Sequence, residues 1–103
     1  MFKLRFTRIF ETWLEAFLDK RTRRRIEVRV DRIAQGNFGD FKHVGGSVLE
    51  ARLHFGPGYR LYFCQEGNTL IVMLAGGDKS SQSADVERAM RIQSDLDGDH
   101  YDD

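Results

Sequence analysis

The stretch EARLHFGPGYRLYFCQEGNTLIVMLAGGDKSSQ, residues 50–82, decides the fold. Apolar and polar residues alternate from Val48 to Phe55, which is typical of a strand with one buried face. Gly56-Pro57-Gly58 then predicts a tight turn into a second strand, Tyr59 to Gln65. After another turn, the uninterrupted apolar run from Leu70 to Ala75 favours a central strand covered on both faces. The stretch therefore predicts three consecutive antiparallel strands.

The segments before this stretch predict one strand and two helices. Alternation from Phe2 to Thr7 indicates a half-buried strand. Apolar residues recur at helical spacing from Arg8 to Leu18, with Thr7 able to cap the helix. Asp19 opens a second helix that Gly36 ends, so the two form an αα-hairpin. The segment 36–46 contains four glycines and is expected to be a loop.

A last helix is predicted after Ser80 and Ser81, with Val86, Ala89 and Met90 in its buried stripe and Asp85 exposed. The predicted order is therefore β-α-α-β-β-β-α. This order is typical of an α+β domain whose helices cover one side of an antiparallel sheet.

Composition indicates one folded domain in a reducing compartment. The chain has 103 residues and a single cysteine, Cys64, so no intrachain disulfide can form. No signal peptide is evident, and no apolar run approaches the roughly 20 residues of a membrane span, so we expect a cytoplasmic protein. Residues 95–103 hold five acidic residues, which leaves 16 basic against 11 acidic residues in the rest of the chain. We expect residues 1–94 to form a basic domain and 95–103 a flexible acidic tail.

The three-strand stretch also carries the candidate chemistry. Arg52 and His54 share one face of a strand, the hairpin should place Arg60 beside them, and Lys79 leaves the end of the next strand. RNA cleavage without a metal needs a base, an acid and a cation for the phosphorane. We assign His54 as general acid or base, Arg60 as the phosphate clamp, and Arg52 and Lys79 as secondary cations.

Simpler interpretations remain open for each of these residues. A strand histidine and arginine also form solvated cross-strand pairs, Lys79 can pair with Asp78 at a helix entry, and Tyr59 can stack on a base or lie in the core. Seven basic residues within 20–32 form either a solvated helix face or a phosphate-contacting rim. No metal site is expected, because the histidines lack metal-ligand spacing with Cys64 or a carboxylate cluster.

Five motifs spread over the chain up to about residue 93 carry a family resemblance: Phe10-x-x-Trp13-Leu14, Arg32-x-x-x-Gly36-Asn37-x-Gly39-Asp40, Glu50-x-Arg52, Gly56-Pro57-Gly58-Tyr59-Arg60-x-Tyr62, and Gly76-Gly77-Asp78-Lys79-x-x-Gln82. In these motifs the chain resembles the RelE/ParE/HigB superfamily of toxins from bacterial type II toxin–antitoxin modules. It is most similar to the HigB-like branch, often labelled addiction-module killer proteins.

The resemblance implies a RelE-like fold and a toxin that cleaves mRNA in the ribosomal A site without a cofactor. Its partners would be the ribosome, mRNA and a small antitoxin, usually of helix-turn-helix type, in a toxin–antitoxin hetero-oligomer. The basic positions of the family fall on Arg52, Arg60 and Lys79. We expect RNA contacts from Arg21, Arg24, Arg25, Tyr59 and Gln82. The basic αα-hairpin is also a candidate antitoxin surface.

The chain departs from the family in its last helix. Several RelE-type enzymes have a functional tyrosine near the start of that helix, where this chain has Ser83, Ala84, Asp85 and Val86. The departure leaves His54 as the acid–base candidate, or makes cleavage depend more on ribosomal groups. Two alternatives stay open: a ParE-type inhibitor of DNA gyrase without nuclease activity, and a decayed, non-toxic protein that binds an antitoxin.

Overall fold

The computed structural model describes residues 1–99, which form one sheet and the helices packed on it. In chain order the elements are β1 (Lys3–Phe6), α1 (Arg8–Glu15), α2 (Lys20–Ala34), β2 (Phe41–Gly45), β3 (Val48–Arg52), β4 (Tyr59–Glu66), β5 (Leu70–Asp78), a 3-10 turn (Lys79–Ser81) and α3 (Gln82–Asp99). The spatial order of the strands is β1-β5-β4-β3-β2. β1 runs parallel to β5, whereas the other neighbours are antiparallel, so the sheet is mixed.

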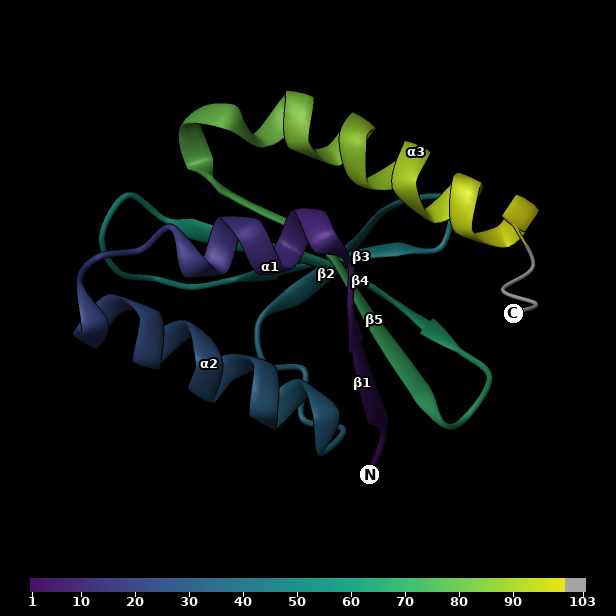
Figure 1. Ribbon diagram of the computed structural model, residues 1–103, viewed down its shortest axis with the longest axis horizontal. Coiled ribbons are helices and arrows are strands. Elements are labelled where there is room, and N and C mark those ends of the chain that lie inside the picture. The colour runs from purple at the N-terminus through teal and green to yellow at the C-terminus, as the bar shows by residue number, and fades with distance from the viewer. Residues whose placement is uncertain (100–103) are drawn as a thin grey trace.

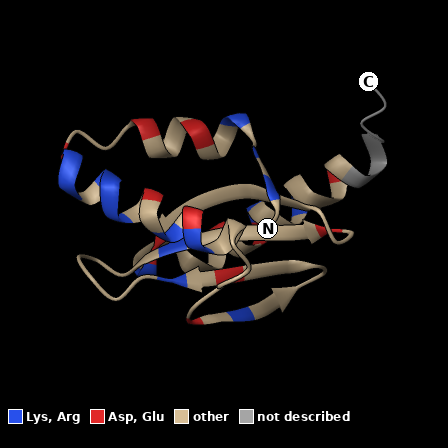
Figure 2. Cartoon of the chain, turned by 90° about the horizontal axis from the view of Figure 1, so that it is seen from below, with Lys and Arg blue, Asp and Glu red and all other residues tan. Residues whose placement is uncertain are grey.

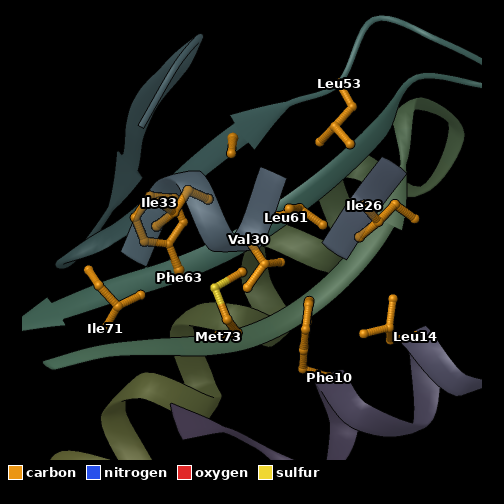
Figure 3. Close-up of a cluster of buried hydrophobic side chains, with 11 residues drawn as sticks. Phe10, Leu14, Ile26, Val30, Ile33, Leu53, Leu61, Phe63, Ile71 and Met73 are labelled. Carbon is orange, nitrogen blue, oxygen red and sulfur yellow. The ribbon is translucent and has the colours of Figure 1, made fainter. Parts of the chain in front are cut away.

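Helices cover both faces of this sheet. Figure 1 shows α2 on one side of the strands and α3 on the other. The first core joins side chains of α1 and α2, such as Phe10 and Ile33, to Leu61, Phe63 and Met73 of the sheet (Figure 3). The second core, on the opposite face, packs Ala89 of α3 against side chains of three strands: Val48, Tyr62, Cys64, Val72, Leu74 and Ala75. The described chain is therefore a three-layer arrangement with the sheet in the middle.

This architecture contradicts the predicted fold class, a RelE-like β-α-α-β-β-β-α order on an antiparallel sheet with its helices on one side. The described chain has five strands, a parallel β1–β5 pair and helices on both faces. The physical reason lies in β4 and β5, because residues 61–64 and 71–75 are all buried. Strands buried on both faces need a layer on each side.

The additional strand, β2, lies within the segment predicted to be a loop. Phe41–Gly45 pairs antiparallel with β3 at the edge of the sheet, with a register shift between His43 and Gly45. Its residues are exposed or half-buried, so no buried apolar run marks it. Pairing with β3 forms the strand, which local composition does not reveal.

Side-chain caps fix the beginnings of the first two helices. Thr7 Oγ1 accepts a hydrogen bond from Phe10 N and donates one to Leu74 O, so it joins α1 to the middle of β5. Asp19 accepts from Arg21 N and from Thr22 Oγ1 at the start of α2. The predicted cap residues are therefore confirmed, although α1 ends at Glu15 rather than Leu18.

The C-terminal end of the described chain is helical. α3 continues to Asp99 and so includes the first five residues of the predicted acidic tail, while residues 100–103 lie outside the described part. Within residues 1–99, no helix combines the length and apolar character that crossing a membrane requires.

Candidate functional site

The four predicted catalytic residues line one open pocket at the end of the β3–β4 hairpin. Arg52 and Arg60 are register partners on β3 and β4, and the hairpin closes through hydrogen bonds Leu53 N to Tyr59 O (2.9 Å) and Gly58 N to Phe55 O (3.1 Å). Gly56 and Gly58 have φ values of 55° and 80°, which other residues rarely adopt. The turn therefore fixes the position of Arg60 near the start of β4.

Lys79 reaches the same pocket from the end of β5. A Cβ at Gly58 would lie 3.4 Å from Lys79 Cβ, which places the lysine beside the hairpin turn. The resulting pocket has a volume of about 460 Å³ and is lined by residues 52–58, Arg60 and Lys79. We call it the hairpin pocket. The structure thus brings Arg52, His54, Arg60 and Lys79 together.

His54 is exposed and held from one side by a carboxylate. Its Nε2 lies 2.6 Å from Asp40 Oδ2, and their side chains are 73% and 48% exposed. The hydrogen bond from His54 is the main cause that lowers the pKa of Asp40, with the charges of His54, Arg52 and Arg29 acting in the same direction. With Nε2 engaged, Nδ1 is the ring nitrogen that remains to exchange a proton with a substrate.

A fully buried carboxylate, Glu50, contacts Arg52, one of the cations of the hairpin pocket. It accepts hydrogen bonds from Tyr62 Oη (3.1 Å), Gln82 Nε2 (2.9 Å) and Arg52 Nε (3.3 Å). Its donors come from β3, β4 and the start of α3, so Glu50 connects Arg52, which lines the hairpin pocket, to the helix. Burial and the adjacent Glu50 carboxylate raise the pKa of the Tyr62 hydroxyl well above its usual range, which keeps it a donor.

Arg60 combines a buried donor with an accessible position. Its Nε is buried and has no hydrogen-bond partner among the described residues. An unpaired buried donor costs about 1–3 kcal/mol, and such exceptions call for an explanation other than stability. Arg60 also faces Arg52 directly across the strands, and like charges in that position repel. The arrangement suits binding of an anion better than it suits stability.

The predicted RNA-contacting residues are distributed differently. Arg24 and Arg25 lie on α2, where basic positions concentrate (Figure 2), and they line a neighbouring pocket. Arg21 is exposed in the first turn of α2 and lines neither pocket. Tyr59 packs into an aromatic cluster with Phe17 and Phe55, at centroid distances of 5.2 and 5.4 Å.

Gln82 and two acidic side chains also differ from the predicted arrangement. The Gln82 amide is engaged by Glu50 rather than directed at the hairpin pocket. The alternative interpretation of Lys79, an ion pair with Asp78 at the helix entry, is not what the structure shows, since the Asp78 carboxylate accepts from Ser80 N and Oγ. Asp85, predicted to be exposed, is 8% exposed and accepts a hydrogen bond from Ser81 Oγ.

The sequence did not identify three residues that organise the site: Asp40, Glu50 and Arg29. Arg29 donates from its guanidinium to the carbonyl oxygens of Phe38, Asp40 and Arg52, and so ties α2 to the end of β3. Alternation from Val48 to Phe55 predicts Glu50 on the polar strand face with Arg52 and His54. Its position between apolar neighbours in VLEARL is the one sequence signal that favours burial. Arg29 and Asp40 carry no comparable signal.

The described chain thus defines a class: a three-layer α/β protein whose mixed sheet ends in a basic pocket supported by a buried carboxylate. Within residues 1–99, no group of three or more His, Cys, Asp or Glu side chains is placed to hold a metal ion. No model of a known protein family matches the chain. It is 35% identical over 94 residues to an uncharacterized protein of Haemophilus influenzae, an alignment that covers 91% of this chain and 95% of the other. The chain belongs to the same family as that protein.

Proposed function

We propose that this protein is a cytoplasmic toxin of a type II toxin–antitoxin module and that it cleaves mRNA on the ribosome without a metal cofactor. The observation that carries the proposal is the meeting of Arg52, His54, Arg60 and Lys79 around the hairpin pocket. The motif resemblance to HigB-like toxins supports it from the sequence. A small antitoxin, usually of helix-turn-helix type, would neutralise the toxin in a hetero-oligomer.

The geometry suggests how the residues divide the reaction. Attack of the 2′-oxygen forms the new P–O bond and breaks the bond to the 5′-oxygen. His54 Nδ1 exchanges a proton with one of these oxygens, and Asp40 on Nε2 stabilises the charged imidazole. Arg60 and Arg52 neutralise the added charge on the phosphorane, and Lys79 contributes a further cation. The second proton transfer falls to ribosomal groups.

The test is to map new mRNA ends in a translating extract. We expect cuts with the parent protein, about a 100-fold loss of rate with His54→Ala, because proton transfer contributes about 10²–10⁴-fold, and loss of cutting with Arg60→Ala. Arg91→Ala, an exposed change on α3, removes the same charge as Arg60→Ala and should cut like the parent.

Each result that contradicts the proposal would indicate a different function for this protein. Absence of new ends together with DNA damage on induction would indicate a gyrase inhibitor. Growth unaffected by induction without an antitoxin would indicate a non-toxic binding protein.

A further inference from the structure

A second basic pocket lies directly beside the hairpin pocket. It has a volume of about 370 Å³ and is lined by side chains of α2 and of the segment that follows β3: Arg24, Arg25, Val28, Arg29, Arg32, Leu53, His54 and Phe55. We call it the helix pocket. The two pockets share the wall Leu53-His54-Phe55. None of the described residues that line them is acidic, and the nearby carboxylate of Asp40 is engaged by His54.

The helix pocket is built by contacts that hold its floor in place. The guanidinium of Arg29 donates to three backbone carbonyls, at 2.8 Å for both Arg52 O and Asp40 O. Arg25 lies over the ring of Phe55, with 3.7 Å from its Cζ to the ring centroid, so a cation is fixed on the shared wall. Arg29 is engaged by the backbone, and Arg24 lies 3.7 Å from Glu27 in a pair whose arginine side chain is 68% exposed. Because exposed ion pairs of this kind are weak, Arg24 can exchange Glu27 for a phosphate, and with Arg25 and Arg32 it supplies the cations that a ligand can meet.

We infer that the two pockets form one track for single-stranded RNA, with successive phosphates in the hairpin pocket and the helix pocket. This inference rests on the proposed function and specifies where the substrate extends beyond the reacting phosphate. His54, 73% exposed, stands on the wall between the pockets, where a strand passing from one to the other must cross it. A polyanion fits two adjacent basic pockets better than a small anion, which would fill only one.

The charge pattern also separates RNA from an acidic protein segment. Arginines on both sides of the shared wall suit phosphates, because a guanidinium matches two phosphate oxygens and its charge is retained at any working pH. His54 is exposed on the shared wall, where it could transfer a proton during RNA cleavage. Binding of a protein segment would not require a proton-transfer group at that position. We therefore commit to RNA and treat acidic peptide as an outcome of the test.

The experiment measures binding of 2′-O-methyl RNA, which cannot be cleaved, by fluorescence anisotropy over a range of salt concentrations. The probes are a dinucleotide, which fills one pocket, and an octanucleotide, which spans both. The variants are Arg24→Ala/Arg32→Ala for the helix pocket and Arg60→Ala for the hairpin pocket. Lys3→Ala/Arg91→Ala, two exposed changes on β1 and α3, is the charge-matched control.

We expect the Arg24/Arg32 variant to lose at least tenfold affinity for the octanucleotide and to bind the dinucleotide like the control. Its slope of log affinity against log salt should fall by about 1.4, since each phosphate contact on a single strand contributes about 0.7. Arg60→Ala should weaken both probes.

Octanucleotide affinity and slope equal to those of the control would overturn the track, as would equal losses for both probes. The track is also overturned if a ten-residue glutamate peptide, and not RNA, depends on Arg24 and Arg32. These readouts are independent of cleavage, so a track without nuclease activity refutes only the proposed reaction.

Discussion

Replacing Glu50 by glutamine tests whether one buried carboxylate holds together Arg52 of the hairpin pocket, Tyr62 and Gln82. The carboxylate accepts from Arg52 Nε through Oε1 and from both Tyr62 Oη and Gln82 Nε2 through Oε2. Glutamine keeps a single acceptor oxygen and places an NH2 group where the second oxygen stood. With Tyr62 and the Gln82 amide in their present orientations, at least one of the three donors then faces another donor.

The expected cost follows from these three bonds. A hydrogen bond to a charged group contributes about 1.5–3 kcal/mol, and a buried donor left unpaired costs about 1–3 kcal/mol. Glu50→Gln should therefore lower the free energy of unfolding by about 2–4 kcal/mol. Glu50→Ala, which leaves all three donors without an acceptor, should cost about 3–5 kcal/mol. Small domains are stable by about 5–15 kcal/mol, so the glutamine variant should still fold.

The assay is urea unfolding followed by fluorescence of Trp13, the single tryptophan, which packs 5.0 Å from Phe17 and 5.8 Å from Phe10 between ring centroids. Glu87→Gln, an exposed change on α3, is the matched control and should lie within about 0.5 kcal/mol of the parent. The reasoning is refuted if Glu50→Gln is also within that range, since the charge of the carboxylate would then contribute nothing to holding its donors.

Four further predictions address other contacts. Thr7→Val should lower the free energy of unfolding by about 1–2 kcal/mol in urea titration, because α1 loses its cap, while Thr7→Ser should stay near the parent. Gly77→Ala should cost about 1–3 kcal/mol, because its Cβ would collide with Asp85 Oδ2, and the cost should shrink in an Asp85→Ala background. In His54→Ala, carboxyl NMR titration should show the pKa of Asp40 rising toward 3.8, and an unchanged titration would contradict the hydrogen bond. The raised pKa of Tyr62 means that the folded state retains a proton that the unfolded state loses above pH 10.0, so stability should fall as pH rises through 10. Tyr62→Phe should remove up to about 1.4 kcal/mol per pH unit from that slope, and an unchanged slope would show that Tyr62 does not cause it.

The sequence predicted those parts of the fold that depend on local patterns. Thr7 and Asp19 cap helices as expected because a cap requires only the residues of one turn. The run from Leu70 to Ala75 forms a strand between β1 and β4 because an uninterrupted apolar segment needs cover on both faces.

The layer arrangement could not be predicted from the same patterns. β2 is an exposed edge strand that depends on pairing with β3, and the parallel β1–β5 pair joins residues nearly 70 positions apart, such as Lys3 and Leu70. Alternation in β3 placed Glu50 on a polar face, but α3 covers that face and buries it. A polar residue on a strand can be assigned to solvent or to buried hydrogen-bond partners only when the element that packs on that face is known.

Within the site, the sequence predicted which basic residues lie around one pocket, but it did not predict the carboxylates that hydrogen-bond to Arg52 and His54. Hairpin register follows from the turn, so Arg52 and Arg60 could be paired from residue spacing alone. The contact of Asp40 with His54 spans 14 residues and two strands, and the hydrogen bond of Gln82 to Glu50 spans 32 residues. Both depend on how β2 and α3 pack.

The balance of these contacts explains why a stable domain retains the hairpin pocket. Opposed arginines repel by a fraction of a kcal/mol to about 1 kcal/mol, and the unpaired Nε of Arg60 costs about 1–3 kcal/mol more. Glu50 offsets this by accepting from Arg52 while it ties Tyr62 and Gln82 to the same point. The negative charge is fully buried, so it stabilises Arg52 without occupying the surface that an anion would approach. An exposed carboxylate at the position of Glu50 would face an approaching anion and repel it, and burial of Glu50 avoids this repulsion. Asp40, the half-exposed carboxylate of the site, is instead paired with His54.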